Sequence, residues 1–335
     1  MQAVIATAYG GPEVLTAVHA HPEPRPGPGQ VLVNVAASGV NFIDISQRRG
    51  VFAVPTPFVP GVEGAGTVAE LGPDVTGVAV GDRVAWAMDG SVTTAYGGYA
   101  QRAVVSADRA VPIPEGLSAE SAASVLMHGM TAHYLTHDTH RIRQGETVVV
   151  HAAAGGLGGL LTQYAVARGA RVIATVSDPA KHARARAAGA DLVFGYDGFA
   201  ERVREATDGR GADVVYDGVG AATFDGGLAS LRTRGTMVLL GGASGPVRDF
   251  DTGRLLGAGS LYLTRPGIAD YLRDRAELLA RARDVFERTL AGALRPHVGG
   301  RYPLAQARRA HEDLESRRTT GKLLLIPGAD AFAGG

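Results

Sequence analysis

The chain has 335 residues, of which 45% are hydrophobic and 20% are charged. This length exceeds one ordinary hydrophobic core and predicts two domains, and the composition excludes a disordered or fibrous chain. The 33 basic and 33 acidic side chains balance, so net charge gives no reason to expect nucleic acid or a membrane as partner. Neither a signal-peptide pattern nor a bilayer-length apolar run is visible, so we expect a soluble, cytoplasmic protein.

Residues 1–123 are expected to form a compact all-β unit. Short runs rich in β-branched residues, separated by Gly and Pro, have the pattern of strands. These runs are residues 2–6, 30–38, 64–72, 81–87 and 99–105.

From about Thr147 the pattern changes to strands that alternate with helices. The expected pairs are 147–152 with 155–169, 171–176 with 179–190, 192–196 with 199–209 and 213–219 with 221–231, and strands 236–242 and 260–264 follow. Such alternation predicts a parallel sheet with right-handed crossovers, which makes residues 124–265 a Rossmann domain.

The rest of the chain no longer repeats this pattern. Apolar spacing from Ile268 to Leu290 predicts a long helix, and a further helix and the strand 322–327 end the chain. We therefore assign this tail to the first domain, which becomes discontinuous, with residues 1–123 and 266–335.

A glycine-rich turn joins the first predicted strand of the Rossmann domain to its helix. It reads Ala153-Ala154-Gly155-Gly156-Leu157-Gly158, with alanine where the usual fingerprint has its first glycine. Small residues here let backbone N–H groups and the helix N-terminus approach a pyrophosphate. A glycine-rich string alone could be an ordinary tight turn, but the strand before it and the helix after it favour dinucleotide binding.

The end of the second strand distinguishes NADPH from NADH. NAD-binding domains carry an acidic residue there for the ribose hydroxyls, whereas this chain has Val176 and Ser177, with Lys181 on the next turn. A hydroxyl and a lysine suit a 2′-phosphate, and Tyr196 follows the third strand nearby. Lys181 could instead be a solvated helix residue, and Asp178 argues mildly against a phosphate. The pattern favours NADPH over NADH.

Several motifs in family order resemble the zeta-crystallin-like quinone oxidoreductases, a zinc-free branch of the medium-chain dehydrogenases/reductases. They are GVNFID (39–44), PGVEGAG (60–66), GDRV (81–84), GMTAHYL (129–135), HAAAGGLG (151–158), VVYDGVG (214–220), SLYLTRP (260–266) and LESR (314–317). The resemblance implies an α/β chain made of a GroES-like β-barrel domain and a doubly wound Rossmann domain. It also implies a homodimer formed through the Rossmann domains.

The same resemblance implies where NADPH binds. The residues that match are Gly155, Gly156 and Leu157 at the phosphates; Ser177, Lys181, Tyr196 and Arg317 at the 2′-phosphate; Thr131, Tyr134, Gly218, Gly241, Ser244, Leu263 and Arg265 at the nicotinamide; and Phe42 and Ser46 in the loop 41–46 that closes over the ring.

Zinc is not expected. The zinc-dependent relatives have a cysteine and a histidine ligand where this chain has Asn41 and Val62, and valine has no atom that can bind a metal. With no cysteine in the chain, a structural four-thiolate zinc site and a disulfide are excluded as well. We interpret the closely spaced His133, His137 and His140 as helix-surface or helix-end residues.

Without a metal, the chemistry expected is hydride donation from NADPH to an acceptor that is already electrophilic, such as a quinone. Asn41, Asp44 and His128 are the catalytic candidates, because they could bind or protonate an acceptor oxygen. Asn41 and Asp44 could instead cap a turn, and His128 could be a buried structural histidine.

Two departures leave the acceptor open. The family's quinone reductases tend to have tyrosines where this chain has Ser46 and Phe52, and the segment 87–100 looks longer than usual. Reduction of enones or 2-alkenals is therefore kept as an alternative to quinone reduction. A third alternative is an NADPH-binding redox sensor without turnover.

Overall fold

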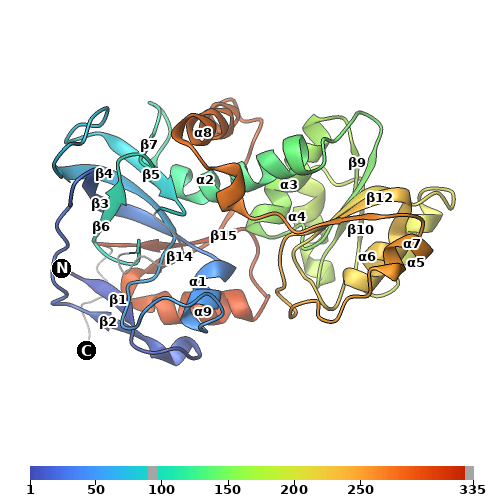
Figure 1. Cartoon of the computed structure of the whole chain (residues 1–335), viewed down its shortest axis with the longest axis horizontal. Helices are drawn as coiled ribbons and strands as arrows, with labels where there is room; N and C mark the ends of the chain where they lie inside the picture. The colour runs from blue at the N-terminus through green and yellow to red at the C-terminus, as the bar shows by residue number, and fades with distance from the viewer. Residues whose placement is uncertain (90–96, 329–335) are drawn as a thin grey trace. The chain divides into compact units, whose positions relative to one another are not determined.

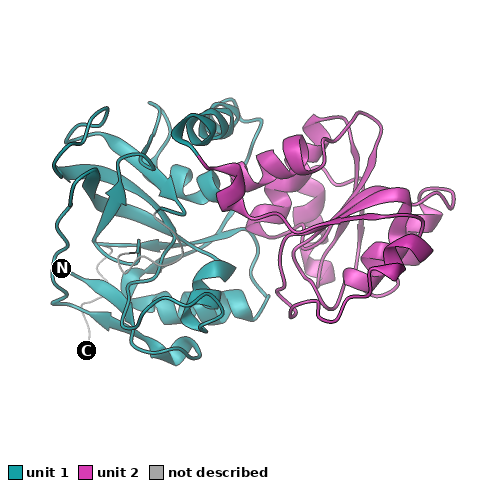
Figure 2. Cartoon of the chain, viewed as in Figure 1, with its two compact units in different colours: residues 1–127, 274–335 teal, residues 128–273 magenta. Residues whose placement is uncertain are grey.

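The computed structural model describes residues 1–89 and 97–328. The chain divides into two compact units, of which unit 1 is Met1–Met127 with Asp274–Gly335 and unit 2 is His128–Arg273 (Figure 2). The functional domain limits of 123/124 and 265/266 stay a prediction. The expected long segment 87–100 falls partly outside the described residues.

Unit 2, whose strands β9, β10 and β12 are labelled in Figure 1, is built on one parallel sheet. The strand order is β10-β9-β8-β11-β12-β13. Its strands are β8 (Thr147–Val150), β9 (Arg171–Thr175), β10 (Leu192–Phe194), β11 (Ala212–Asp217), β12 (Leu231–Leu239) and β13 (Tyr262–Thr264). The order reverses between β8 and β11, the arrangement of dinucleotide-binding folds, whose ligands bind at the carboxyl ends of the strands. The α/β class and the parallel Rossmann sheet are confirmed.

Helices connect these strands, and an apolar core lies between them and the sheet. The helices are α3 (Gly156–Ala167), α4 (His182–Ala187), α5 (Phe199–Glu205), α6 (Phe224–Ser230) and α7 (Gly253–Gly257), with shorter turns η2 (Leu135–Thr139), η3 (Pro179–Lys181) and η4 (Ile268–Tyr271). Val149, Ile173 and Val215, each in a different strand, pack with Phe199 and Phe224 in one core. α5 and α6 therefore cover one face of the sheet.

Unit 1 contains a seven-stranded sheet of order β14-β15-β3-β4-β5-β7, in which β6 also pairs with β3, and a separate β1-β2 pair. The strands are β1 (Ala3–Ala6), β2 (Leu15–Val18), β3 (Gln30–Val40), β4 (Glu63–Leu71), β5 (Arg83–Ala87), β6 (Arg102–Ser106), β7 (Val111–Pro112), β14 (Val298–Pro303) and β15 (Lys322–Ile326). The C-terminal strand β15 pairs with β3, so the tail belongs to the fold of this unit.

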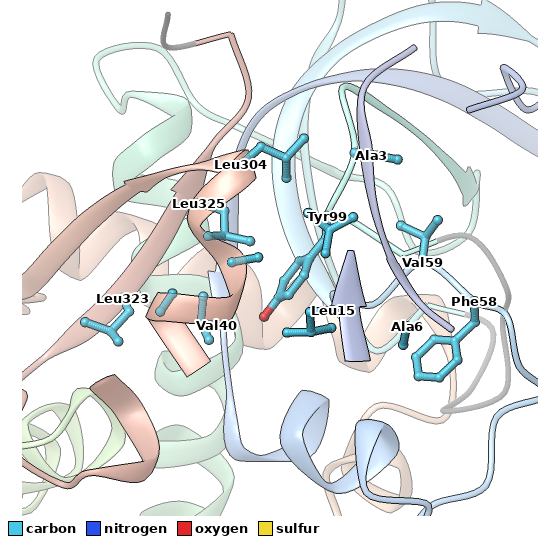
Figure 3. Close-up of a cluster of buried hydrophobic side chains, with 14 of the residues drawn as sticks. Ala3, Ala6, Leu15, Val40, Phe58, Val59, Tyr99, Leu304, Leu323 and Leu325 are labelled. Atoms are coloured by element: carbon cyan, nitrogen blue, oxygen red, sulfur yellow. The ribbon is translucent and has the colours of Figure 1, made fainter. Parts of the chain in front are cut away.

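Helices of unit 1 pack beside these strands. They are η1 (Pro12–Val14), α1 (Phe42–Arg48), α8 (Arg275–Leu290), η5 (Leu304–Gln306) and α9 (Ala307–Glu315), and α2 (Ala119–Tyr134) runs through the limit at Met127. Figure 3 shows Tyr99 within an apolar cluster that joins early strands to Leu304, Leu323 and Leu325 near the C-terminus. No helix in the described ranges is long and apolar enough to cross a membrane.

The structure corrects three expectations. The first segment is not all-β, because residues expected as the loop 41–46 form the start of α1. The long helix expected from Ile268 to Leu290 is interrupted, because Asp274 caps a new helix, its carboxylate accepting the Glu277 N–H at 2.8 Å. Strands β2, β7 and β14 were not predicted.

Candidate functional site

The turn between β8 and α3, where the sequence predicts a phosphate site, is tightly folded. Ala152 adopts a left-handed conformation with φ of 52°, and the Gly155 N–H donates to its carbonyl at 2.9 Å. A Cβ on Gly158 would lie 2.8 Å from Ala153 Cα and closer still to the Ala152 carbonyl. Only glycine lets the first turn of α3 come this close to the loop.

The N-terminus of α3 is not capped by the side chain of its N-cap residue. Its N-cap is Gly155, which has no side chain with which to accept from the first N–H groups of the helix. Twelve residues of helix direct the positive end of their dipole toward this turn. The Gly155 N–H is used within the turn, where it donates to Ala152. Gly156 and Leu157, in the first turn of α3, are therefore the positions whose N–H groups could bind a pyrophosphate.

The tip of β9 presents a hydroxyl and an ammonium together. Lys181 Nζ donates to Ser177 Oγ at 3.0 Å, and partial burial lowers the pKa of Lys181 although Asp178 opposes the shift. The Asp178 carboxylate is used locally, accepting the Ala180 N–H at 2.8 Å as the cap of η3. This arrangement suits an anion at Ser177 and Lys181.

The remaining residues predicted at the 2′-phosphate are in different units. Tyr196 follows β10 in unit 2, and its ring meets His151 edge to face with centroids 6.1 Å apart. Arg317 lies just beyond α9 in unit 1, with a left-handed φ of 57°. The structure thus brings Ser177 and Lys181 into contact and leaves the role of Arg317 a prediction.

The loops after β11 and β12 are tied together by Ser244. Its N–H and its hydroxyl both donate to the Val219 carbonyl at 2.7 Å, and its Oγ accepts the Ala222 N–H at 3.0 Å. A Cβ on Gly241 would lie 2.7 Å from the Gly218 carbonyl. Gly218, Gly241 and Ser244 therefore set the close spacing of two loops at the carboxyl edge of the sheet.

Asp217 organises the same edge and was not predicted. Its buried carboxylate accepts from the N–H groups of Val219 and Gly220 at 2.7 and 2.9 Å and from the hydroxyl of Thr223. An aspartate at a strand end followed by Gly-Val-Gly is a local turn signal that could have identified it.

The predicted nicotinamide and proton-donor residues of unit 2 are mostly buried. On α2, Thr131 is 9% exposed and Tyr134 is 2% exposed, and the Tyr134 ring stacks on Tyr271 at 4.1 Å. His128 is half-buried on the same helix. Leu263 lies in β13 and packs on the core, and Arg265 follows that strand.

Asn41 is held by two buried charges of unit 1. Its amide nitrogen donates to Glu63 Oε1 at 2.8 Å, and its amide oxygen accepts from Lys322 Nζ at 2.6 Å. Lys322 also forms an ion pair with Glu63, and all three residues are at most 5% exposed. This supports the alternative that Asn41 braces the start of α1; its catalytic role remains a prediction.

Asp44, in the first turn of α1, is fully buried. Its carboxylate accepts from the N–H groups of Asn41 and Val62 at 2.8 and 3.1 Å and from the Tyr99 hydroxyl at 3.3 Å. Burial raises its pKa to about 6, although these backbone hydrogen bonds and the charge of Lys322 oppose the shift. Asp44 thus closes the first turn of α1, as Asp does in a capping position.

The surface of α1 carries the other two predicted contacts. Phe42 is 42% exposed, and Ser46 Oγ donates to the Phe42 carbonyl at 2.9 Å. Exposed Phe52 follows the helix, with its N–H donating to the Ser46 carbonyl at 3.3 Å. The helix therefore presents an apolar surface with one hydroxyl that is already engaged.

In the part of the chain that the structure describes, no three His, Asp or Glu side chains are grouped so as to hold a metal ion. His133 and His137 stack face to face at 4.2 Å. His140 Nε2 lies 3.1 Å from Glu146. All three histidines are half-buried, His133 and His137 within helical turns and His140 at the helix end, which agrees with the helix-surface or helix-end interpretation.

The chain is similar to known proteins over almost its full length. Residues 27–115 match the model of the alcohol dehydrogenase GroES-like domain, and residues 156–272 match that of the zinc-binding dehydrogenases. A quinone oxidoreductase from Pseudomonas aeruginosa is 42% identical over 325 residues, which cover 96% of this chain and 98% of the relative. The chain belongs to the quinone oxidoreductase family of the medium-chain dehydrogenases/reductases. This confirms the family and the GroES-like fold expected from the sequence.

One further relative and one solved structure are also similar to this chain over nearly their whole length. A 2-haloacrylate reductase from a Burkholderia species is 38% identical over 310 residues, covering 90% of this chain and 92% of the relative. A mycobacterial protein crystallised with NADPH is 46% identical, covers 98% of this chain and 100% of its own, and superposes with a TM-score of 0.93.

Proposed function

We propose that this protein is an NADPH-dependent quinone reductase that transfers a hydride from NADPH to a quinone without a metal. The observation that carries the proposal is the strand-turn-helix unit at 147–167, with the Ser177–Lys181 pair at the end of the next strand. Its relatives in the comparison include a named quinone oxidoreductase and a protein crystallised with NADPH.

Two features of unit 2 support binding of NADPH. Gly158 lets the first turn of α3 pack closely on the turn that would hold the pyrophosphate, and Lys181 in η3, after β9, would meet the 2′-phosphate. When bound, NADPH supplies the hydride. Gly156 and Leu157 would hold the pyrophosphate, and Ser177, Lys181, Tyr196 and Arg317 would hold the 2′-phosphate.

The acceptor is expected to be electrophilic already, because the residues that replace the zinc ligands cannot hold a metal ion that would act as a Lewis acid. Val62 has no ligating atom, and both polar ends of the Asn41 amide are bonded to Glu63 and Lys322. We propose that Asn41 and Asp44 orient α1, whose apolar surface at Phe42 receives the acceptor, and that His128 is the candidate proton donor.

Reduction of a carbon–carbon double bond conjugated to a carbonyl is the second candidate. It is favoured by the similarity to a 2-haloacrylate reductase and by Phe52, which offers no hydroxyl to a quinone oxygen. A redox sensor without turnover is the third. NADPH oxidation by the purified protein, followed by absorbance with ortho- and para-quinones and with simple enones, separates the three.

In this assay we expect rapid NADPH oxidation with quinones, slower oxidation with enones, and little activity with NADH. A clear preference for enones would move the protein to the alkene reductases. Binding of NADPH with no turnover on either class would leave only the sensor.

Replacing Lys181 with Met is expected to raise KM for NADPH about tenfold, the scale of one charge-assisted hydrogen bond, and to leave KM for NADH unchanged. Steady-state kinetics with both cofactors measures this. Arg186→Met is the matched control, because Arg186 is an exposed cation of the adjoining helix α4 that donates to the Asp191 carbonyl. Equal losses for both cofactors would remove Lys181 from the phosphate site.

We also propose a homodimer formed through the Rossmann units. The strand β13 is an edge of the sheet, and Tyr262 on it and Leu256 nearby are 61% and 75% exposed. An exposed edge with apolar side chains can pair with another chain. A cytoplasmic location is proposed as well, and the absence of cysteine is compatible with it.

Tyr262→Asp is therefore expected to shift the protein from dimer to monomer, because a charge on a paired edge opposes strand addition. Light scattering after size-exclusion chromatography gives the mass directly. Asp249→Asn, a surface change in the same unit, should leave the mass unchanged. A Tyr262→Asp protein that stays dimeric would place the interface elsewhere.

A further inference from the structure

His151, the residue that follows β8, is buried, and only one of its two ring nitrogens has a hydrogen-bonding partner among the described residues. It is 3% exposed, and its Nδ1 lies 2.6 Å from Thr175 Oγ1, at the end of β9. Its Nε2 is buried and has no hydrogen-bonding partner among the residues that the structure describes. Native structures rarely keep such an atom without a reason in function.

The imidazole belongs to a polar row at the carboxyl edge of the sheet. Thr175, His151 and Asp217 each stand two residues beyond Ile173, Val149 and Val215, which pack in the core on the face covered by α5 and α6. Because side chains alternate along a strand, the three polar residues share that face. The row ends the apolar core at the edge where the candidate cofactor loops begin.

Stability does not account for His151. Burial lowers its pKa to about 4 although the charge of Asp217 opposes the shift, so the ring is neutral near pH 7. An unpaired polar atom in the interior costs folding energy, whereas an apolar side chain would continue the core at no such cost. Its contacts therefore decide what it does.

Those contacts reach both sides of the predicted phosphate subsite. Thr175 precedes Ser177 by two residues, and Ser177 Oγ accepts a hydrogen bond from Lys181 Nζ. On the other side, the His151 ring meets Tyr196 edge to face at 6.1 Å. The Thr175 carbonyl also accepts the Ala153 N–H of the phosphate loop at 3.1 Å.

We propose that His151 is a positioning residue for the 2′-phosphate end of NADPH, acting through Thr175 and Tyr196. By fixing the end of β9 and the ring after β10, it sets the spacing at which Ser177, Lys181 and Tyr196 meet the phosphate. The inference rests on the proposed function, since it assumes NADPH as the cofactor, and it adds a residue to which no role was assigned.

The test replaces both members of the hydrogen bond with apolar groups. The double variant His151→Leu/Thr175→Val leaves neither partner unsatisfied, so its melting temperature is expected to stay close to that of the native protein. We expect the dissociation constant for NADPH to rise about tenfold and that for NADH to change less than twofold, measured by the fluorescence of the bound reduced nicotinamide. His151→Asn and Thr175→Ser keep a polar pair and should retain most of the affinity.

The outcomes separate this inference from the proposed function. Equal weakening for NADPH and NADH would show a general structural effect and overturn it, as would unchanged NADPH affinity in the double variant. If the double variant does not fold, Thr175→Val alone carries the same comparison with Thr175→Ser. Native protein that binds no NADPH would overturn the proposed function, whereas native binding with an unaffected variant would overturn only the role of His151.

Discussion

Lys322→Met is expected to lower the free energy of unfolding of unit 1 by about 3–5 kcal/mol, the cost of leaving a buried charge without its partner. Lys322 is 2% exposed and Glu63 is 1% exposed, and they form an ion pair that also binds the Asn41 amide. A Cβ on Gly39 would lie 2.6 Å from Lys322 Cε. The absence of a side chain at Gly39 therefore leaves the space that Lys322 occupies beside Glu63.

Urea unfolding, monitored by tryptophan fluorescence, measures the free energy of unfolding of unit 1. The chain has a single tryptophan, Trp86, which is buried in β5 of unit 1. Arg301→Met is the matched control, because Arg301 pairs with Glu120 at the surface, where the side chains are 56% and 36% exposed. Such a pair contributes at most about 1 kcal/mol.

The double variant Lys322→Met/Glu63→Gln decides whether the charge is the cause. The substituted amide would keep an acceptor for Asn41 and would remove the orphaned carboxylate of Glu63, so much of the loss should be recovered. A double variant as unstable as Lys322→Met would mean that the methylene packing of Lys322, and not its charge, stabilises this site.

Local patterns were sufficient to predict the Rossmann unit. The first four strands there are short apolar runs, and each is followed by a helix, so the order along the chain predicts a parallel sheet. The predicted phosphate loop at 153–158 and the pair Ser177 and Lys181 lie within that local sequence. The contact of Lys181 with Ser177 could be anticipated because the two residues are four positions apart.

Unit 1 was harder to predict because its elements are short or depend on distant partners. α1 has only seven residues, too few for an apolar period to be visible. The spacing of Asn41 and Asp44 does contain the capping signal, since Asp44 accepts the Asn41 N–H, and it was interpreted as chemistry first. β14 contains two glycines and little apolar sequence, so nothing local marks it as a strand.

The polar interior could not be derived from sequence spacing at all. Lys322 meets Asn41 across 281 positions, and Tyr99 meets His311 across 212, with Tyr99 Oη 3.0 Å from His311 Nε2. No short-range pattern links such residues. The antiparallel pairing of β15 with β3 brings Lys322 and Asn41 together, and His311 lies in α9 of the C-terminal segment. Asn41 could therefore be selected as a candidate residue, but its partners appear only in the folded chain.

Gly158→Ala is expected to reduce kcat/KM with NADPH about 100-fold, because the added methyl group would displace the phosphate loop, and misplacement of about 1 Å can cost this much. The Cβ would meet two backbone groups, the Ala152 carbonyl and Ala153 Cα, which have no side-chain rotation with which to move aside. The loop or the first turn of α3 must shift, and the N–H groups that would bind the pyrophosphate shift with it.

The neighbouring Gly159→Ala is the control for this prediction. Its Cβ would lie 3.5 Å from the Ala153 carbonyl, an ordinary contact, and alanine raises helix propensity equally at both positions. Stopped-flow binding of NADPH, with far-UV circular dichroism to confirm that unit 2 remains folded, should show weakening in Gly158→Ala alone. Normal binding by folded Gly158→Ala would move the pyrophosphate away from this turn, and the NADPH site would then have to be sought elsewhere along the carboxyl edge of the sheet.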